Sequence, residues 1–300
     1  MLIINSLQNF PCLKRMDLSN SKYLVETPDF SGVPNLERLD ISGCTGLMFV
    51  HPSMRRLENL VFLSFRNCNN LISIKIGLGD YNISLRVVHF SGCTKLKDTP
   101  DFTRTRNLEY LDFDGCTSLS SVHKSIGALA KFTFLSLRDC KNLVSIPNID
   151  GMPSLQTLDL WGCLKLKYLP LGQAFSPSSH LKSLVFLDMG FCNLVKVPDA
   201  IGELRCLERL NLQGNNFVSI PYGSFYGLHR LAYLNLSHCH KLKILLLDLP
   251  LISTSSGGRY FKTVCGSRDH RSFDCPKLAQ MLLVPPRTDF ALTWLVRLIE

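Results

Sequence analysis

A twelve-residue pattern of apolar and polar positions recurs along the chain. In residues 36–47, LERLDISGCTGL, apolar side chains occupy positions 1, 4, 6 and 12, and a cysteine occupies position 9. Similar stretches begin at Leu108, Leu155 and Leu207, the last with asparagine in place of the cysteine. Because apolar positions 4 and 6 alternate with polar ones, as in Leu39-Asp40-Ile41, each stretch predicts a short strand with one buried face.

Ten copies of the pattern follow one another at nearly constant spacing, with intervals of 23, 24, 25, 23, 24, 23, 29, 23 and 24 residues. This matches the period of roughly 20 to 29 residues, and the L-x-x-L-x-L-x-x-C/N-x-x-L signature, of leucine-rich repeats. The longest interval contains LGQAFSPSSHLKS, a Ser/Pro insertion suited to a convex loop. The copies begin at Leu13, Leu36, Leu60, Leu85, Leu108, Phe132, Leu155, Leu184, Leu207 and Leu231.

One coil cannot bury its own core, whereas stacked coils bury a continuous one. We therefore predict an α/β-type solenoid, a leucine-rich repeat horseshoe of about ten coils with a parallel concave sheet and an irregular or 3-10 convex side. Prolines such as that of Ile146-Pro147 suit the convex side, where no ladder amide is needed. Residues 1–12 form an N-terminal flank with a partial coil, residues 13–249 the repeats, and residues 250–300 a post-repeat cap or truncated module, in which 289–300 has apolar residues at helical spacing.

Position 9 holds cysteine in eight of the copies. There the chain must leave the strand and turn, and its backbone groups would be buried without partners at a cost of about 1–3 kcal/mol each. A compact side chain that hydrogen-bonds inward solves this problem, and both Asn and Cys can do so. We predict an inner structural ladder made of Cys44, Cys68, Cys93, Cys116, Cys140, Cys163, Cys192, Asn215 and Cys239.

The remaining strand positions (2, 3, 5, 7 and 8) are predicted to face the concave surface. Position 3 is mostly aromatic or Arg, residue types enriched at binding hot spots, and position 5 is mostly acidic or polar. Aromatic neighbours in register also stabilise parallel strands, so packing is the alternative interpretation. The predicted partner-binding residues are Arg15, Arg38, Phe62, Tyr110, Asp112, Phe134, Asp159, Trp161, Phe186, Arg209 and Tyr233.

Composition and charge restrict the class of protein. A hydrophobic content of 46% and a charged content of 19% are unlike a disordered polar chain. The net charge is +9, but no Lys/Arg run exceeds two residues, which favours a solvated basic surface over a nucleic-acid partner. No apolar run approaches the ~18 residues of a membrane span, and no basic segment precedes an apolar core as in a secretory signal. We therefore expect an intracellular chain without a membrane partner.

The sequence shows no catalytic, cofactor or metal motif. No C-x-x-C pair occurs, and one cysteine per coil points inward along a line, so we predict no metal site. The eight histidines are spread across different coils, where stacking does not favour a catalytic triad, so we predict that the chain is not an enzyme. We expect no cofactor.

Residues 24–44, LVETPDFSGVPNLERLDISGC, resemble the leucine-rich repeat region of plant disease resistance proteins that carry an N-terminal TIR domain and a central nucleotide-binding domain. The segments VHPSMRRLENL (50–60), VHKSIGALAKF (122–132) and VPDAIGELRCL (197–207) fit that family's inter-strand pattern, and FDCPKLAQ (273–280) resembles its post-repeat segment. The phosphate-loop motif G-x-x-x-x-G-K-[ST] is absent, so the family's TIR and nucleotide-switch activities are not carried over.

The resemblance implies a protein-recognition module of an intracellular immune receptor, cytoplasmic or nuclear. It would sense a pathogen effector or a guarded host protein in defence signalling, and would contact the nucleotide-binding domain of the same receptor if the receptor is full length. The alternatives are a stand-alone scaffold or adaptor, a fragment of a cell-surface receptor, and a decayed fragment with no function of its own.

Overall fold

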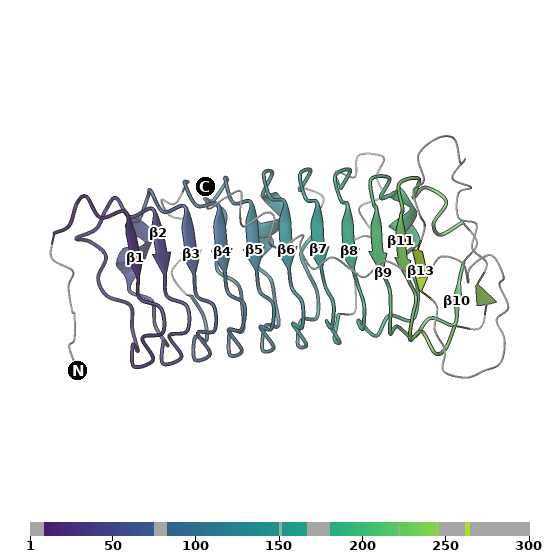
Figure 1. Cartoon of the computed structure of the whole chain (residues 1–300), viewed down its shortest axis with the longest axis horizontal. Helices are drawn as coiled ribbons and strands as arrows, with labels where there is room; N and C mark the ends of the chain where they lie inside the picture. The colour runs from purple at the N-terminus through teal and green to yellow at the C-terminus, as the bar shows by residue number, and fades with distance from the viewer. Residues whose placement is uncertain are drawn as a thin grey trace.

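The computed structural model describes residues 9–74, 83–149, 152–166, 181–221 and 223–242, together with the backbone of 244–245 and 262–264. A short strand lies at positions 3 to 5 of every predicted copy, and the strands stand side by side in chain order (Figure 1). They are β1 (Arg15–Asp17), β2 (Arg38–Asp40), β3 (Phe62–Ser64), β4 (Val87–His89), β5 (Tyr110–Asp112), β6 (Phe134–Ser136), β7 (Thr157–Asp159), β8 (Phe186–Asp188), β9 (Arg209–Asn211) and β11 (Tyr233–Asn235).

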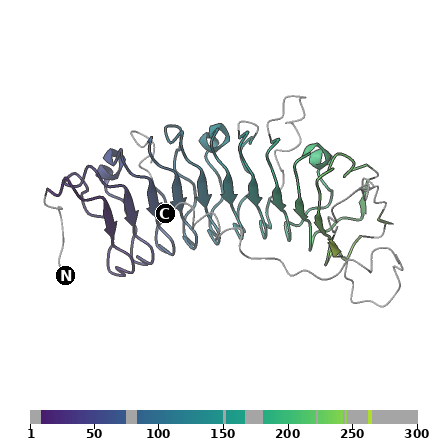
Figure 2. The same cartoon turned by 45° about the horizontal axis from the view of Figure 1, so that its top comes forward.

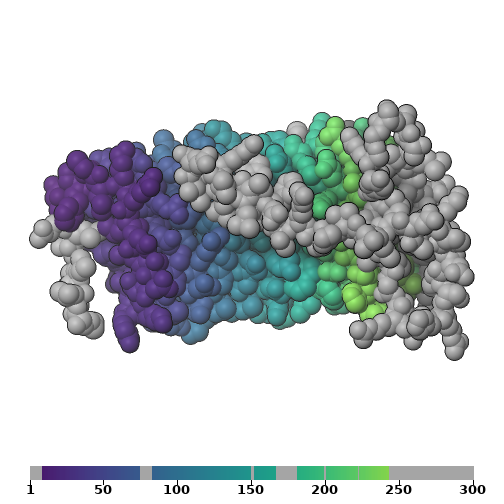
Figure 3. Space-filling model, in the orientation of Figure 1, coloured from purple at the N-terminus to yellow at the C-terminus, as the bar shows by residue number. Residues whose placement is uncertain are grey.

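All neighbouring strands are parallel, and equal positions face each other, as Leu39 of β2 faces Leu63 of β3. The predicted solenoid is therefore confirmed. An eleventh strand, β13 (Lys262–Val264), pairs with β11 and extends the sheet with residues that the sequence placed beyond the repeats. In the space-filling view the colours follow one another along the long axis, so each coil lies against its neighbours (Figure 3).

The side of the coils away from the sheet is irregular, with 3-10 helices η1 (Pro52–Arg56), η2 (Lys124–Ala128) and η3 (Asp199–Glu203) along one edge (Figure 2). Near the C-terminal end of the repeats, β10 (Ser219–Ile220) pairs in parallel with β12 (Ile244–Leu245). The predicted helix at 289–300 lies outside the described residues.

Helices η1 and η2 begin in the same way because their sequences begin alike, VHPS and VHKS. In η1, the His51 ring accepts a hydrogen bond from the amide of Ser53, as a helix N-cap does. The Ser53 hydroxyl accepts from the amide of Phe30 in the preceding coil at 2.7 Å, and buried Thr27 accepts from the amide of His51 at 2.8 Å. Thr27, which precedes Pro28, therefore links one convex segment to the next.

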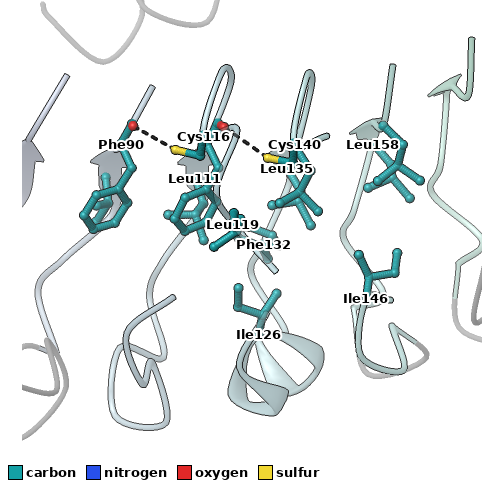
Figure 4. Close-up of a cluster of buried hydrophobic side chains, with 14 of the residues drawn as sticks. Phe90, Leu111, Cys116, Leu119, Ile126, Phe132, Leu135, Cys140, Ile146 and Leu158 are labelled. Carbon is teal, nitrogen blue, oxygen red and sulfur yellow. Dashed lines mark hydrogen bonds between the residues drawn. The ribbon is translucent and has the colours of Figure 1, made fainter. Parts of the chain in front are cut away.

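The core lies between the sheet and the convex side (Figure 4). Leucines at position 4 are fully buried in most coils, and burying one such side chain contributes about 1.5–3 kcal/mol. At position 6, the rings of Phe65, Phe90 and Phe113 form an inner aromatic stack, with centroids 5.4 and 5.1 Å apart and planes 4° apart.

Each strand ends in a turn whose chemistry repeats. In nine of the ten coils the position 5 side chain accepts a hydrogen bond from the amide two residues later, as Asp40 does from Ser42 at 3.0 Å. Position 8 is left-handed in all ten coils, with φ between 53° and 76°. The sequence predicts position 8 on the concave surface, whereas its backbone angles place it in the turn that follows the strand. Gly, Asn and Asp occupy it in eight coils because they tolerate this conformation best, and Phe191 and His238 are the exceptions.

Candidate protein-binding surface

The outer side of the sheet, called here the strand face, consists of positions 3 and 5 of each strand with the adjoining position 7. The eleven predicted partner-binding residues all lie on it, because position 4 between them points into the core. Arg15 is exposed, Tyr110 and Asp112 are nearly buried at 7% exposure, and the other eight are half-buried.

Aromatic rings from successive coils touch along the strand face. The Tyr110 ring stacks on that of Phe134 with centroids 4.2 Å apart and planes 3° apart. His89, which the sequence analysis did not select, bridges Phe62 and Tyr110 with centroid distances of 5.6 and 5.0 Å. These four residues form an outer aromatic row, which joins β3 to β6.

Arginines cover several rings of the strand face. The Arg38 guanidinium lies 3.7 Å from the Phe62 centroid, and that of Arg209 lies 5.9 Å from the Tyr233 centroid. Arg138 lies 4.2 Å from the Trp161 centroid. Such cation–π contacts hold large side chains in place, so less conformational freedom is lost when a partner binds.

His89 is the one residue of position 5 for which no bond to the turn amide is found, and its neighbours differ accordingly. Arg66 Nη2 lies 3.0 Å from His89 Nδ1, and because a guanidinium only donates, Nδ1 accepts and Nε2 carries the hydrogen. Nε2 is buried and has no hydrogen-bond partner in the described part of the chain. Burial lowers the pKa of His89, and Arg66 lowers it further, although Asp112 opposes this. In the sequence, His89 differs from the other nine copies, which have Asp, Asn or Ser at position 5.

The aspartates of position 5 differ in their electrostatics. Burial tends to raise the pKa of Asp112, but the neighbouring His89 ring, the hydrogen bond that the Asp114 amide donates and the Arg66 guanidinium lower it overall. Asp159 and Asp188 face each other on β7 and β8, and burial and then Asp188 raise the pKa of Asp159 to about 7. Burial also raises the pKa of Asp188, although the Gly190 amide and Asn211 donate hydrogen bonds to it. Arg138 lies 3.7 Å from Asp159.

The predicted inner ladder is built from one repeated contact (Figure 4). Each ladder cysteine directs its Sγ to the position 6 carbonyl of the preceding coil, at 3.0 to 3.3 Å. Asn215 donates to Met189 O and Leu212 O at 2.8 Å each and accepts from the Leu194 amide at 3.0 Å. The donating residues are Cys44, Cys68, Cys93, Cys116, Cys140, Cys163, Cys192, Asn215 and Cys239.

The ladder thiols are unsuited to chemistry. Burial raises the pKa of the thiols from Cys44 to Cys192 above the usual value, which disfavours the reactive thiolate. Among the described residues, no group of three His, Cys, Asp or Glu side chains could hold a metal ion. In the same part of the chain, no helix has the length and hydropathy needed to span a bilayer.

Comparisons with known proteins agree with the stacked coils. A family model described as leucine rich repeat matches residues 179–240. TMV resistance protein N of Nicotiana glutinosa is 29% identical over 284 residues, covering 78% of this chain and 24% of that protein. Disease resistance protein RPS4B of Arabidopsis thaliana is 29% identical over 240 residues, covering 79% of this chain and 17% of that protein. The chain therefore spans less than a quarter of the length of these relatives.

A solved structure of the leucine-rich repeat domain of the type III effector XopL covers 80% of this chain, and the chain covers 77% of it, at 21% identity and a TM-score of 0.44. That superposition is too loose to support an inference about function. The coils thus have the leucine-rich repeat pattern, the leucine rich repeat family model matches part of them, and the chain is similar over most of its length to plant disease resistance proteins.

Proposed function

We propose that the chain is the protein-recognition module of an intracellular plant immune receptor, and that its strand face binds a pathogen effector or a guarded host protein. The observation that supports this most is the outer aromatic row, Phe62, His89, Tyr110 and Phe134, with arginine stacked on Phe62 at its end. Aromatic side chains and arginine make most of the hot spots in protein interfaces.

Leucine-rich repeat folds typically serve as non-catalytic interaction modules, and we propose no reaction for this chain. Its resemblance to the resistance proteins further suggests contacts with a nucleotide-binding domain in a full-length receptor, and action in the cytoplasm or nucleus.

Proximity labelling in pathogen-challenged leaf tissue would test the proposal. Three chains fused to the labelling enzyme are compared: the wild type, a strand-face variant with Phe62→Ala, Phe134→Ala and Phe186→Ala, and a matched control. The control carries Val195→Ala, Val218→Ala and Tyr226→Ala, which replace residues outside the strand face that are 68%, 55% and 69% exposed.

We expect at least one protein to be labelled by the wild type and the control but not by the strand-face variant. That protein, once purified, should bind the chain with a Kd at least about tenfold weaker for the strand-face variant. Identical labelling by all three folded chains would contradict the proposal. Circular dichroism would establish that each variant is folded.

A further inference from the structure

The turns after the strands form a second candidate surface, called here the loop edge, which consists of positions 8, 10 and 11 of each coil together with position 7, where it meets the strand face. It runs below the arrowheads in Figure 1. Its residues are strongly biased in charge, because its only acidic side chains in the described coils are Asp114 and Asp139. Its basic side chains are Lys22, Arg66, Lys95, Arg138, Lys141, Lys165 and Lys241.

One residue of the loop edge, Phe191, adopts a backbone conformation that its side chain disfavours. It has φ 53° at the position where eight coils have Gly, Asn or Asp and one has His238 (φ 59°), all residue types that enter this region more readily. A bulky residue in the left-handed region is a true outlier, and such strain persists where the residue serves a function. Each of the other coils is an internal control, because the same turn forms there without the strain.

Neighbouring glycines make room for the rings. A Cβ on Gly214 would collide with the Phe191 ring, and a Cβ on Gly190 would lie 2.8 Å from Trp161 Cδ1. The Trp161 and Phe191 rings meet edge to face, with centroids 5.4 Å apart. Two adjacent coils therefore depart from the common turn sequence, with Trp161 at position 7 of one and Gly190-Phe191 at positions 7 and 8 of the next, while Gly214 of the third coil is the usual residue of position 8.

The rings continue toward the end of the repeats. His238 lies 6.3 Å from Phe191 and 5.9 Å from His240, measured between ring centroids, and both histidines are exposed. We define Trp161, Phe191, His238 and His240 as the aromatic patch. Lys165 and Lys241, both exposed, lie in the same turns as Trp161 and as the two histidines.

The charge of this surface selects the chemistry of its partner. Lysines and Arg138 lie in the turns around the patch, and Asp139 lies in the turn that also holds Arg138 and Lys141. Its other acidic neighbours are Asp159, which accepts from the Trp161 amide and lies 3.7 Å from Arg138, and Asp188, which accepts from the Gly190 amide. Single-stranded nucleic acid would need open ring faces on which bases could stack. The Trp161 face is already covered by Arg138 at 4.2 Å, and Phe191 meets the Trp161 edge, so an acidic polypeptide fits better than a nucleic acid.

We propose that the aromatic patch binds an acidic segment of a protein partner, with an apolar or aromatic side chain against Phe191 and carboxylates beside Lys165 and Lys241. This inference rests on the proposed role as a recognition module, but it uses a surface separate from the outer aromatic row. Phe191 would thus be retained for recognition although its backbone conformation is strained.

The test uses the whole chain and a synthetic acidic octapeptide, Glu-Glu-Phe-Glu-Glu-Tyr-Glu-Glu. Binding is followed by NMR through the indole N–H of Trp161, which Trp161→Phe assigns against that of the second tryptophan, Trp294. An octapeptide with Lys in place of Glu and an eight-residue thymidine oligonucleotide are compared under the same conditions. We expect the acidic peptide to bind most tightly, and less tightly as salt is added.

Two variants separate recognition from folding. Phe191→Asn installs the residue that Asn20 and Asn67 provide in the same turn, so the thermal midpoint should stay unchanged or rise by about 2 °C. Peptide binding should weaken at least about fivefold. Lys165→Gln should keep the midpoint, weaken binding about threefold and flatten its salt dependence. The matched control, Asn67→Gly, should change neither property.

Several outcomes would overturn the inference. These are no binding of the acidic peptide at millimolar concentration, tighter binding of the oligonucleotide, or unchanged peptide binding by both Phe191→Asn and Lys165→Gln. The strand-face variant described above should bind the peptide like the wild type. If the strand face proves to have no partner while the peptide still shifts the Trp161 indole signal, the proposed function fails and this inference survives. If the strand face has a partner but the peptide does not bind, this inference fails and the proposed function survives.

Discussion

The molecule contains two aromatic stacks that run across neighbouring coils, one inside and one outside. The inner stack, Phe65, Phe90 and Phe113, is fully buried between the sheet and the convex side. The outer row, which includes Tyr110 and Phe134, follows the same coil-to-coil spacing on the other side of the sheet. The repeat thus aligns rings on both sides of the sheet. Only the inner rings fill the closed core between the sheet and the convex side.

Removing one ring from each stack is the strongest way to test this difference. Phe90→Ala should lower the free energy of unfolding by about 3–5 kcal/mol, because it removes buried contacts and leaves a cavity. Phe134→Ala should lower it by about 1 kcal/mol, because the ring is half-buried and loses chiefly its contact with Tyr110. Urea denaturation measures both values. Equal losses would mean that the outer row is also core.

Polar side chains should repeat the contrast with a smaller effect. Asn215→Ala should cost about 2–3 kcal/mol, because it removes the side-chain partner of the Met189 carbonyl and the Leu194 amide and leaves the Leu212 carbonyl with only the weaker Cys239 thiol contact. Asp40→Ala, which removes the turn hydrogen bond to Ser42 on the outer side, should cost about 0.5–1 kcal/mol. Thermal denaturation of the two variants, measured beside the wild type, gives the comparison. A larger loss for Asp40→Ala would show that the turns, rather than the ladder, hold the coils.

The acidic pair on the outer side should make stability depend on pH. The pKa of Asp159 is raised from 3.8 to about 7, so in this window the folded carboxyl keeps a proton that the unfolded one has lost. The free energy of unfolding should therefore fall as the pH rises through this window. In Asp159→Asn that part of the dependence should vanish. Thermal midpoints of both proteins, measured between about pH 4 and pH 8 at intervals of about one pH unit, test this expectation. Curves of the same shape for the two proteins would refute it.

Asp112 should affect stability with the opposite sign, because its pKa is lowered in the folded chain. Its stabilising contribution is present above its unfolded pKa and is lost only in acid.

The smallest effect is expected for an ion pair at the rim of the strand face. Arg86 Nη1 lies 2.6 Å from Glu109 Oε1, with 49% and 20% of the two side chains exposed. Because solvent screens such pairs, Arg86→Gln should change the free energy of unfolding by no more than about 0.5 kcal/mol. Chemical denaturation at low and high salt would measure this change in the free energy of unfolding. A salt-sensitive loss above about 1 kcal/mol would show that the pair stabilises the fold as strongly as an interior contact.

Much of this structure could be predicted from the sequence, because the repeat reports the same environment ten times. The strands, their register and the inward cysteines follow from apolar spacing alone. The second role of position 5, as acceptor for the turn amide, was not predicted, since Asp and Asn suit both a solvated surface and a turn. The strain at Phe191 could not be predicted, because it is visible only in the backbone angles.

The sequence by itself determined the stacking of coils, since a buried strand face, a compact ladder residue and a fixed period permit only one way to cover the core. Tertiary structure alone decided which outward residues act together. The interaction between Asp159 and Asp188 and the contact between Trp161 and Phe191 each join residues more than twenty positions apart. Like the unpaired Nε2 of His89, they depend on distances between coils. A repeat fixes the environment of the positions it repeats, whereas the interactions of its exceptions are set by whatever the neighbouring coil places beside them.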